Sequence, residues 1–153
     1  MENKTSSTAD RELLITKLLD APVDLVWEAW SHPEHICNWW GPNGFTCTIS
    51  KMDLRPEGEW NLVLHGPDGT DYKNHSIFKE VIPQQKISYL HESSPKFLST
   101  ITFEARGEQT FIKWHMLFNN REEFIHTVKT FKADEGLKQN ISKLQDYLAG
   151  MRA

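Results

Sequence analysis

Apolar and polar residues alternate along the middle of the chain, and turn-forming residues interrupt this alternation at regular intervals. In the segment 59–65, for example, Trp60, Leu62 and Leu64 occupy every second position. Such alternation is typical of a strand with one buried face. Clusters of Gly, Pro, Asp and Ser separate the strands and predict an antiparallel meander. The predicted strands span residues 45–54, 59–65, 72–82, 86–91, 97–105 and 109–118.

The residues before this meander predict one further strand or helix and then two short helices. The apolar run 12–19 fits a strand or a helix by periodicity alone. Pro22 suits the first turn of a helix, and apolar residues recur at helical spacing over 23–30. A second short helix is predicted over 33–40, and the Gly-Pro-Asn-Gly turn at 41–44 must end it. We expect the two helices to form an angled pair.

The last part of the chain is predicted to be helical. Asn120 is a good N-cap, and Glu123 completes an approximate capping box. Two apolar stripes follow that point in roughly opposite directions, the first with Phe124, Val128 and Phe131, and the second with Leu137, Ile141, Leu144 and Leu148. Either the helix breaks near 134–136, or its two halves pack against different surroundings. Gly136 suits both accounts, as a break or as a point of close approach.

Strand, two helices, strands and a C-terminal helix together predict an α+β fold. We expect residues 1–11 to form a flexible N-terminal arm and residues 12–150 to form a single domain. A sheet that curls around one helix cannot fill its concave side with that helix alone. The pattern therefore predicts a cavity between sheet and helix, in which a ligand would sit.

Composition narrows the function classes. The 153 residues include 6 Trp and 8 Phe, enough aromatic side chains to fill a core or line a cavity. The net charge of -4 and the lack of a basic run argue against nucleic acid and anionic membrane surfaces. No apolar stretch approaches the roughly 20 residues that span a bilayer, and no signal-peptide pattern precedes the first strand. We therefore expect a cytoplasmic protein without membrane insertion.

A zinc site is the first candidate chemistry that the sequence suggests, because His32, His35, Cys37 and Cys47 lie close together. Their spacing matches no zinc finger, and His35 and Cys37 would point apart on a helix. We interpret the two cysteines as small buried apolar residues that remain thiols in a reducing compartment. Neither a metal nor another cofactor is expected.

Catalytic residues are harder to name. Four histidines lie in predicted strands, namely His65, His75, His91 and His115. One that faced an apolar cavity beside Glu80 or Asp71 could act as an acid or base, but a solvent-facing or hydrogen-bonded role is commoner. Tyr72, Tyr89 and Asn74 are further polar candidates for anchoring a ligand. No Ser-His-Asp, paired-carboxylate or phosphate-loop pattern is recognisable, so a binding role is favoured over an enzyme.

Several motifs carry a family resemblance. They are the sequence DAPVDLVWEAWSHPEH at 20–35, Trp39-Trp40-Gly41-Pro42, Gly58-Glu59-Trp60, the Gly-Pro-Asp-Gly turn at 66–69, the segment 78–83 continuing to Ile87, and Gly136-Leu137 with Leu144. With them the chain resembles bacterial proteins related to the activator of heat-shock-protein-90 ATPase. These belong to the superfamily of START domains, polyketide cyclases and the birch-pollen allergen. Two positions depart from the family pattern: Glu59 replaces a glycine, and Leu137 replaces a tryptophan near the family's cavity.

The resemblance implies a helix-grip fold, in which a curved antiparallel sheet wraps around a long C-terminal helix. It also implies a small hydrophobic or amphipathic ligand held in an internal cavity. The predicted aromatic wall consists of Trp39, Trp40, Phe45, Trp60, Phe78, Tyr89, Trp114, Phe124 and Phe131. His65, Tyr72 and His75 are the predicted polar anchors. The stripe with Val128 is interpreted as a lid over the cavity, with a homodimer contact as the alternative.

Two other functions remain open from the resemblance. One is a co-chaperone-like interaction domain with a role in the stress response. The sequence lacks the additional N-terminal domain of the eukaryotic activators, so chaperone contact by this domain alone is not expected. The other is a cyclase or hydrolase for an aromatic, polyketide-like substrate, which would need an ionisable residue inside the cavity.

Overall fold

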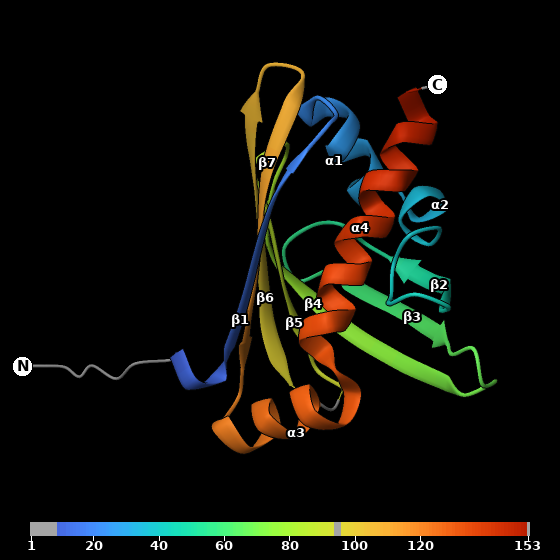
Figure 1. Ribbon diagram of the computed structural model, residues 1–153, viewed down its shortest axis with the longest axis vertical. Coiled ribbons are helices and arrows are strands. Elements are labelled where there is room, and N and C mark those ends of the chain that lie inside the picture. The colour runs from blue at the N-terminus through green and yellow to red at the C-terminus, as the bar shows by residue number, and fades with distance from the viewer. Residues whose placement is uncertain (1–8, 94–95, 153) are drawn as a thin grey trace, which may run out of the picture.

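The computed structural model describes residues 9–93 and 96–152 (Figure 1). Within them, seven antiparallel strands form one curved sheet in the order β1-β7-β6-β5-β4-β3-β2. The strands are β1 (Glu12–Leu19), β2 (Thr46–Met52), β3 (Glu59–His65), β4 (Asp71–Ile82), β5 (Lys86–His91), β6 (Phe97–Arg106) and β7 (Gln109–Phe118). The helices are η1 (Ala9–Arg11), α1 (Val23–Ser31), α2 (Pro33–Ile36), α3 (Arg121–Phe131) and α4 (Ala133–Arg152). The predicted α+β, helix-grip arrangement is confirmed.

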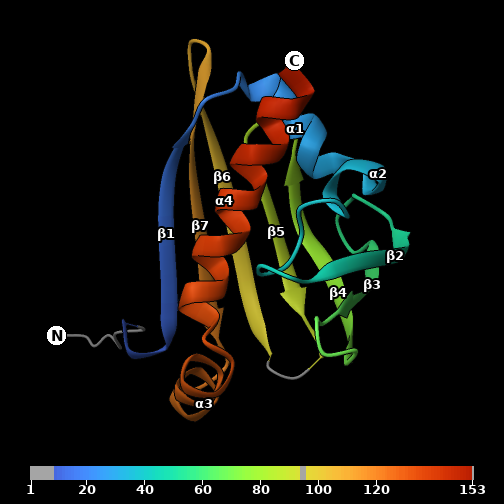
Figure 2. The ribbon, with the colours of Figure 1, turned by 45° about the vertical axis from the view of Figure 1, so that its right-hand side comes forward.

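Helix α4 crosses the concave side of the sheet, with α1 and α2 beside its C-terminal half and α3 at its other end (Figure 2). The stripe of Ile141, Leu144 and Leu148 on α4 is buried, as its spacing predicts. Trp30 of α1 lies in the core with its ring centroid 4.8 Å from that of Trp39 and 5.0 Å from that of Trp114. These contacts fix the two helices against one end of the sheet.

The ambiguous run 12–19 is a strand, and it pairs with β7 along its whole length from Glu12 to Leu19. Of the predicted arm, residues 1–8 lie outside the described part of the chain. Its last residues form the 3-10 helix η1, and the Arg11 guanidinium donates a 2.6 Å hydrogen bond to the carbonyl of Phe118. No helix in the ranges 9–93 and 96–152 combines the length and the apolar composition that crossing a membrane requires.

The second short helix ends earlier than predicted. Helix α2 stops at Ile36 instead of continuing to Trp40, and hydrogen-bonded turns carry the chain onward. On a regular helix only one of two adjacent tryptophans could point inward. Because the chain leaves the helix first, both Trp39 and Trp40 are buried, with 0% and 8% of their surfaces exposed.

The C-terminal segment breaks, which explains its two opposed stripes. The break lies at Lys132, whose φ of 54° is left-handed, and so falls before the predicted site at 134–136. Asn120 caps α3 as predicted, because its side chain accepts a 2.8 Å hydrogen bond from the amide of Glu123. Gly136 lies inside α4 and marks a close approach instead, since an added Cβ would lie 3.4 Å from Cγ of Pro42.

Candidate functional site

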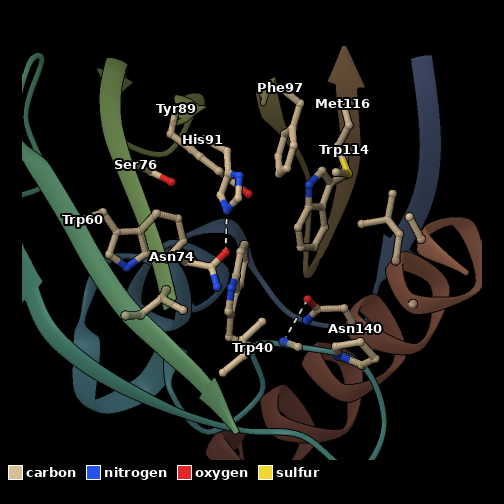
Figure 3. Close-up of a pocket in the computed structure, with 17 residues that line it drawn as sticks. Trp40, Trp60, Asn74, Ser76, Tyr89, His91, Phe97, Trp114, Met116 and Asn140 are labelled. Carbon is tan, nitrogen blue, oxygen red and sulfur yellow. Dashed lines mark hydrogen bonds between the residues drawn. The ribbon is translucent and has the colours of Figure 1, made fainter. Parts of the chain in front are cut away.

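A pocket of about 230 Å³, the inner pocket, lies between the concave face of the sheet and the N-terminal half of α4 (Figure 3). Side chains alternate along a strand, so every second residue of β3 and β4 reaches it. The lining residues are Trp40, Gly41, Pro42, Trp60, Leu62, Leu64, Asn74, Ser76, Tyr89, His91, Phe97, Trp114, Met116, Ala133, Gly136, Leu137 and Asn140. The pocket is therefore mainly aromatic and aliphatic.

Aromatic rings build one continuous wall of the inner pocket. Trp40 stacks on Trp114 with centroids 5.3 Å apart and an interplanar angle of 24°. Trp60 lies 5.0 Å from Trp40 and meets Tyr89 edge to face at the same distance. Offset and edge-to-face pairs of this kind stabilise each other's orientation. The wall is thus held in place by its own packing.

A hydrogen-bonded pair, Asn74 and His91, forms the polar side of the inner pocket. The Asn74 amide donates to the carbonyl of Tyr72 at 3.0 Å, so its oxygen is turned toward Nε2 of His91. Nε2 must then carry the proton and donate. The His91 ring also stacks on Phe97 at 4.5 Å and 12°.

Buried polar groups around the pocket differ in how well they are bonded. Ser99 is fully buried, and its hydroxyl accepts a 3.1 Å hydrogen bond from the indole of Trp114. Burial raises the pKa of Tyr89, and a hydrogen bond with Ser99 acts against this to a smaller extent. The indole N–H groups of Trp30 and Trp60 are enclosed without a partner in the described part of the chain.

Helix α4 holds the loop that carries Trp40. The Asn140 side chain donates to the carbonyl of Trp39 at 2.9 Å and accepts from the amide of Gly41 at 3.0 Å. Lys143 donates to the carbonyls of Gly41, Pro42 and Phe45, at 3.1, 3.2 and 3.4 Å. Burial lowers the pKa of Lys143. The rim of the pocket is therefore anchored before any ligand arrives.

The two cysteines are half-buried thiols, where the sequence predicted buried ones. Burial and, to a smaller extent, Cys37 raise the pKa of Cys47 to about 12, while Lys143 acts in the opposite direction. A neutral thiol is a poor nucleophile and a poor metal ligand. No group of three or more His, Cys, Asp and Glu side chains in the described residues is arranged to hold a metal ion.

A second pocket of about 730 Å³, the outer pocket, lies next to the inner one. The two are adjacent, because they share the lining residues Pro42, Leu64, Asn74, His91 and Gly136. Phe45 and Tyr72 line the outer pocket, and their rings lie 6.0 Å apart. Its charged and titratable lining residues are Asp71, Lys73, Glu123, His126, Lys132 and Glu135. Polarity therefore increases from the inner to the outer pocket.

Some of the predicted aromatic residues line the pockets, and others pack behind the residues that do. Trp40, Trp60, Tyr89 and Trp114 line the inner pocket, and Phe45 and Tyr72 line the outer one. Trp39 and Phe78 lie behind this wall. Trp39 is fully buried and donates to the carbonyl of Ala29 at 3.2 Å, and Phe78 stacks on Trp60 at 5.4 Å.

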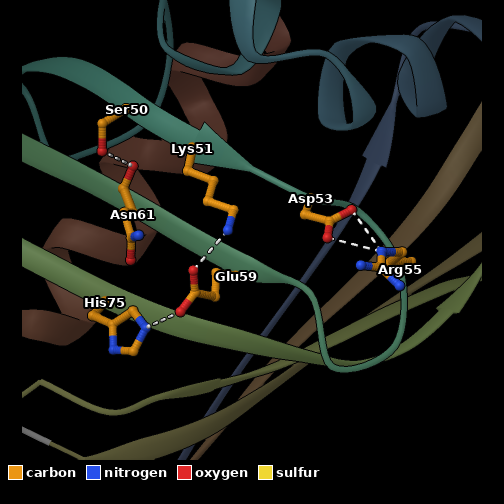
Figure 4. A network of polar contacts seen from close by, with 7 residues as sticks. All are labelled: Ser50, Lys51, Asp53, Arg55, Glu59, Asn61 and His75. Carbon is orange, nitrogen blue, oxygen red and sulfur yellow. Dashed lines mark hydrogen bonds and ion pairs between the residues drawn. The ribbon is translucent and has the colours of Figure 1, made fainter.

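Two predicted polar anchors, His65 and His75, lie outside both pockets, because strand alternation turns them to the opposite face of the sheet. His65 hydrogen-bonds to Asp71 at 2.7 Å and to Thr48 at 2.8 Å. His75 lies 3.7 Å from a carboxylate oxygen of Glu59 in an exposed polar network (Figure 4). These histidines have surface partners in place of a ligand.

Helix α3 turns a different face to the outer pocket from the one predicted for a lid. Phe124 packs against Phe118, with centroids 5.5 Å apart, and Val128 is half-buried outside both pockets. The Phe131 side chain lies outside what the structure describes. The α3 residues that line the outer pocket are Glu123, His126 and Thr127. Capping by Asn120 sets this rotation, because it fixes where the helix begins.

Ser76, Phe97, Met116 and Asn140 are lining residues that the sequence did not single out. Alternation along the strand does place Ser76 on the same face as Phe78, and that was the available signal. Asn140 gave no such signal, because its bonds to residues 39 and 41 join segments about a hundred positions apart in sequence.

Comparison with curated protein sequences finds no match. Solved structures do match. A crystal structure of a protein from Nitrosomonas europaea matches with a TM-score of 0.81 at 24% identity. The match covers 94% of this chain and 97% of the chain in that structure. A solution structure from Arthrobacter aurescens has a TM-score of 0.86 at 19% identity, covering 95% and 90%. At these identities the likeness establishes the fold alone.

A further solution structure, described as an AHSA1-like protein from Aeromonas hydrophila, has a TM-score of 0.71 at 18% identity and covers 91% of this chain and 94% of its own. The sequence itself matches a family model over residues 20–149, and this range contains both pockets' lining residues. The chain belongs to the family described as activator of Hsp90 ATPase homolog 1-like proteins.

Proposed function

We propose that this protein binds a small amphipathic ligand, with the apolar part in the inner pocket and the polar part in the outer pocket. The observation that supports this proposal is that an aromatic pocket of about 230 Å³ adjoins a charged one of about 730 Å³. Ligand pockets are mostly apolar, with a few placed polar groups that fix orientation. Apolar burial would supply the affinity of such a ligand.

Anchoring of the rim supports the proposal. Asn140 and Lys143 bind the backbone of the loop that carries Trp40, so the wall needs little ordering when a ligand enters. A preformed site loses less conformational entropy on binding than a mobile one. The arrangement favours a binding role.

The test is a thermal-shift and tryptophan-fluorescence screen against fatty acids, flavonoids, polyketide-like aromatics and sterols. A ligand that binds the folded state raises its stability by about 2.7 kcal/mol at a hundredfold excess over the dissociation constant. Trp40 and Trp114 line the inner pocket and should report its occupancy. A saturable hit is the expected outcome.

A blocking variant shows where the hit binds. Gly136 lines both pockets, so the side chain of Gly136→Met enters the space where they meet and should abolish the ligand-induced thermal shift. Gly150→Met is the matched control on the same helix, since a Cβ there meets no atom within 4 Å. Equal loss or equal retention of the shift in both variants argues against these pockets. A panel without any hit would favour a surface role, tested next by a chaperone pull-down.

A further inference from the structure

Ser76 on β4 is a buried residue whose hydroxyl has no hydrogen-bond partner among the described residues. Only 3% of its surface is exposed, and it lines the inner pocket. Figure 3 shows its hydroxyl pointing into the pocket on the side of His91, and it has no hydrogen bond with any residue that the structure describes. Ser99, on the same concave face, is instead bonded to Trp114. The hydroxyl is not among the fully enclosed side-chain atoms without a partner in the described residues, so it opens into the pocket, where a ligand group can form a hydrogen bond with it.

Charge is confined to the outer pocket. Among the described residues that line the inner pocket there is no Asp, Glu, Lys or Arg. An ionised ligand group placed there would lose its hydration without gaining an opposite charge, and this is strongly unfavourable. The outer pocket contains side chains of both signs, such as Glu123 and Lys132. The inner pocket therefore favours neutral groups of a ligand, and the outer pocket can accommodate its ionised groups.

The size of the inner pocket sets a further limit. Its volume of about 230 Å³ lies below the roughly 300–1,000 Å³ of most ligand pockets. Trp40 stacks on Trp114, and Trp60 stacks on Phe78 behind it, so these tryptophans line the pocket with flat rings that suit a flat group. A group of one or two rings matches this space better than a sterol or a long acyl chain.

We infer that the inner pocket takes a neutral ring system carrying one hydroxyl or carbonyl group, which hydrogen-bonds to Ser76, while any ionised part of the ligand stays in the outer pocket. This inference rests on the proposed function and specifies its ligand class. Ser76 sets the specificity, and the aromatic wall supplies most of the affinity. Because the serine hydroxyl both donates and accepts, it can bind either group.

Three probes of the same ring size test the inference by isothermal titration calorimetry, with protein titrated into each probe. They are 2-naphthol, 2-methylnaphthalene, in which a methyl replaces the hydroxyl, and 2-naphthoate, which is ionised at neutral pH. We expect 2-naphthol to bind about fivefold more tightly than 2-methylnaphthalene, the value of one neutral hydrogen bond. We expect the carboxylate of 2-naphthoate to stay in the outer pocket, so that the affinity for 2-naphthoate does not depend on Ser76.

Two serine variants test whether Ser76 causes the preference for 2-naphthol over 2-methylnaphthalene. Ser76→Ala should lower the affinity for 2-naphthol about fivefold and leave that for 2-methylnaphthalene unchanged. It should fold normally, because the lost hydroxyl has no hydrogen-bond partner in the part of the chain that the structure describes. Ser88→Ala is the matched control, since Ser88 is also 3% exposed but lines neither pocket. Ser88→Ala should bind all three probes like the unchanged protein.

The outcomes separate the inference from the proposed function. Equal affinities for 2-naphthol and 2-methylnaphthalene, unaffected by Ser76→Ala, would overturn the role of Ser76 and leave the binding function standing. Weaker binding of 2-naphthoate to Ser76→Ala than to the unchanged protein would place the carboxylate against Ser76 and overturn the exclusion of charge. Absence of binding by all three probes would overturn the inference, and a negative ligand panel as well would overturn the proposed function.

Discussion

Replacing Ser99 by alanine should destabilise the protein more than its single lost oxygen suggests. The hydroxyl is fully buried and accepts a 3.1 Å hydrogen bond from the Trp114 indole. Ser99→Ala leaves this indole N–H group buried and unpaired, which costs about 1–3 kcal/mol. For a chain of this length, that lowers the midpoint of thermal unfolding by roughly 2–12 °C.

Thermal and urea unfolding of three proteins would check this reasoning: the unchanged chain, Ser99→Ala and Ser76→Ala. Ser76→Ala removes the same atom from the same face of the sheet, but that atom has no hydrogen-bond partner in the described residues. We expect its free energy of unfolding to stay within about 0.5 kcal/mol of the unchanged value or to rise. Similar losses in the two variants would show that the Trp114 bond does not stabilise the core, and would refute the argument.

Three further predictions follow from packing and titration. Gly136→Ala and Gly150→Ala should each raise the free energy of unfolding by about 0.5–1 kcal/mol, because alanine favours the helix. The new Cβ at 136 lies no nearer than 3.4 Å to another residue, so it fits without a clash. Urea unfolding measures both variants. The pKa of Cys47 is raised to about 12 from 9.0, so stability from the neutral thiol is fully present below pH 9 and is lost as the pH rises toward 12. Cys47→Ala should therefore lose less stability than the unchanged protein over that range, and equal slopes in urea unfolding would contradict this. Leu137→Trp should fill the inner pocket and abolish the ligand-induced thermal shift while the circular dichroism spectrum stays native; a retained shift would place the ligand elsewhere.

Strands were predictable from the sequence because their signals are local. Alternation and turn residues placed 59–65, 86–91 and 109–118 where β3, β5 and β7 lie, and the other predicted strands of the meander differ by one or two residues at an end. The break at Lys132 was less predictable, because a non-glycine residue in a left-handed conformation has no sequence signature. Its position depends on where α4 can pack.

The site was only partly predictable, since its polar members depend on which face of the sheet is concave. Asn74 and Ser76 share a strand with His75, and alternation alone does not say which of them faces the helix. Aromatic residues were easier to identify, because Trp40, Trp60 and Trp114 are buried whether they fill a core or line a pocket. Sequence reasoning therefore found the apolar wall and missed the hydroxyl that we infer sets its specificity.

The two departures from the family pattern have different structural consequences. Glu59 lies on the outer face, where Lys51 donates to it at 2.8 Å and lowers the pKa of its carboxyl (Figure 4). An exposed ion pair of this kind contributes little stability, and no pocket is altered. Leu137 instead lines the inner pocket, where a tryptophan would occupy more volume. The departure at 137 leaves more space in the inner pocket, whereas the departure at 59 changes only the surface.

Two serines on the concave face of the sheet differ in their hydrogen bonding: Ser99 is bonded to Trp114, and Ser76 lines the inner pocket without such a bond among the described residues. Alanine at residue 76 would pack in nearly the same space but could not form a hydrogen bond with a group in the inner pocket. Ser99 shows that this sheet does pair a buried serine where a partner is within reach. The neighbouring pair of Asn74 and His91 is bonded together and so leaves the hydroxyl at 76 unmatched. The hydroxyl at 76 is therefore available to a ligand group in the inner pocket, as we infer.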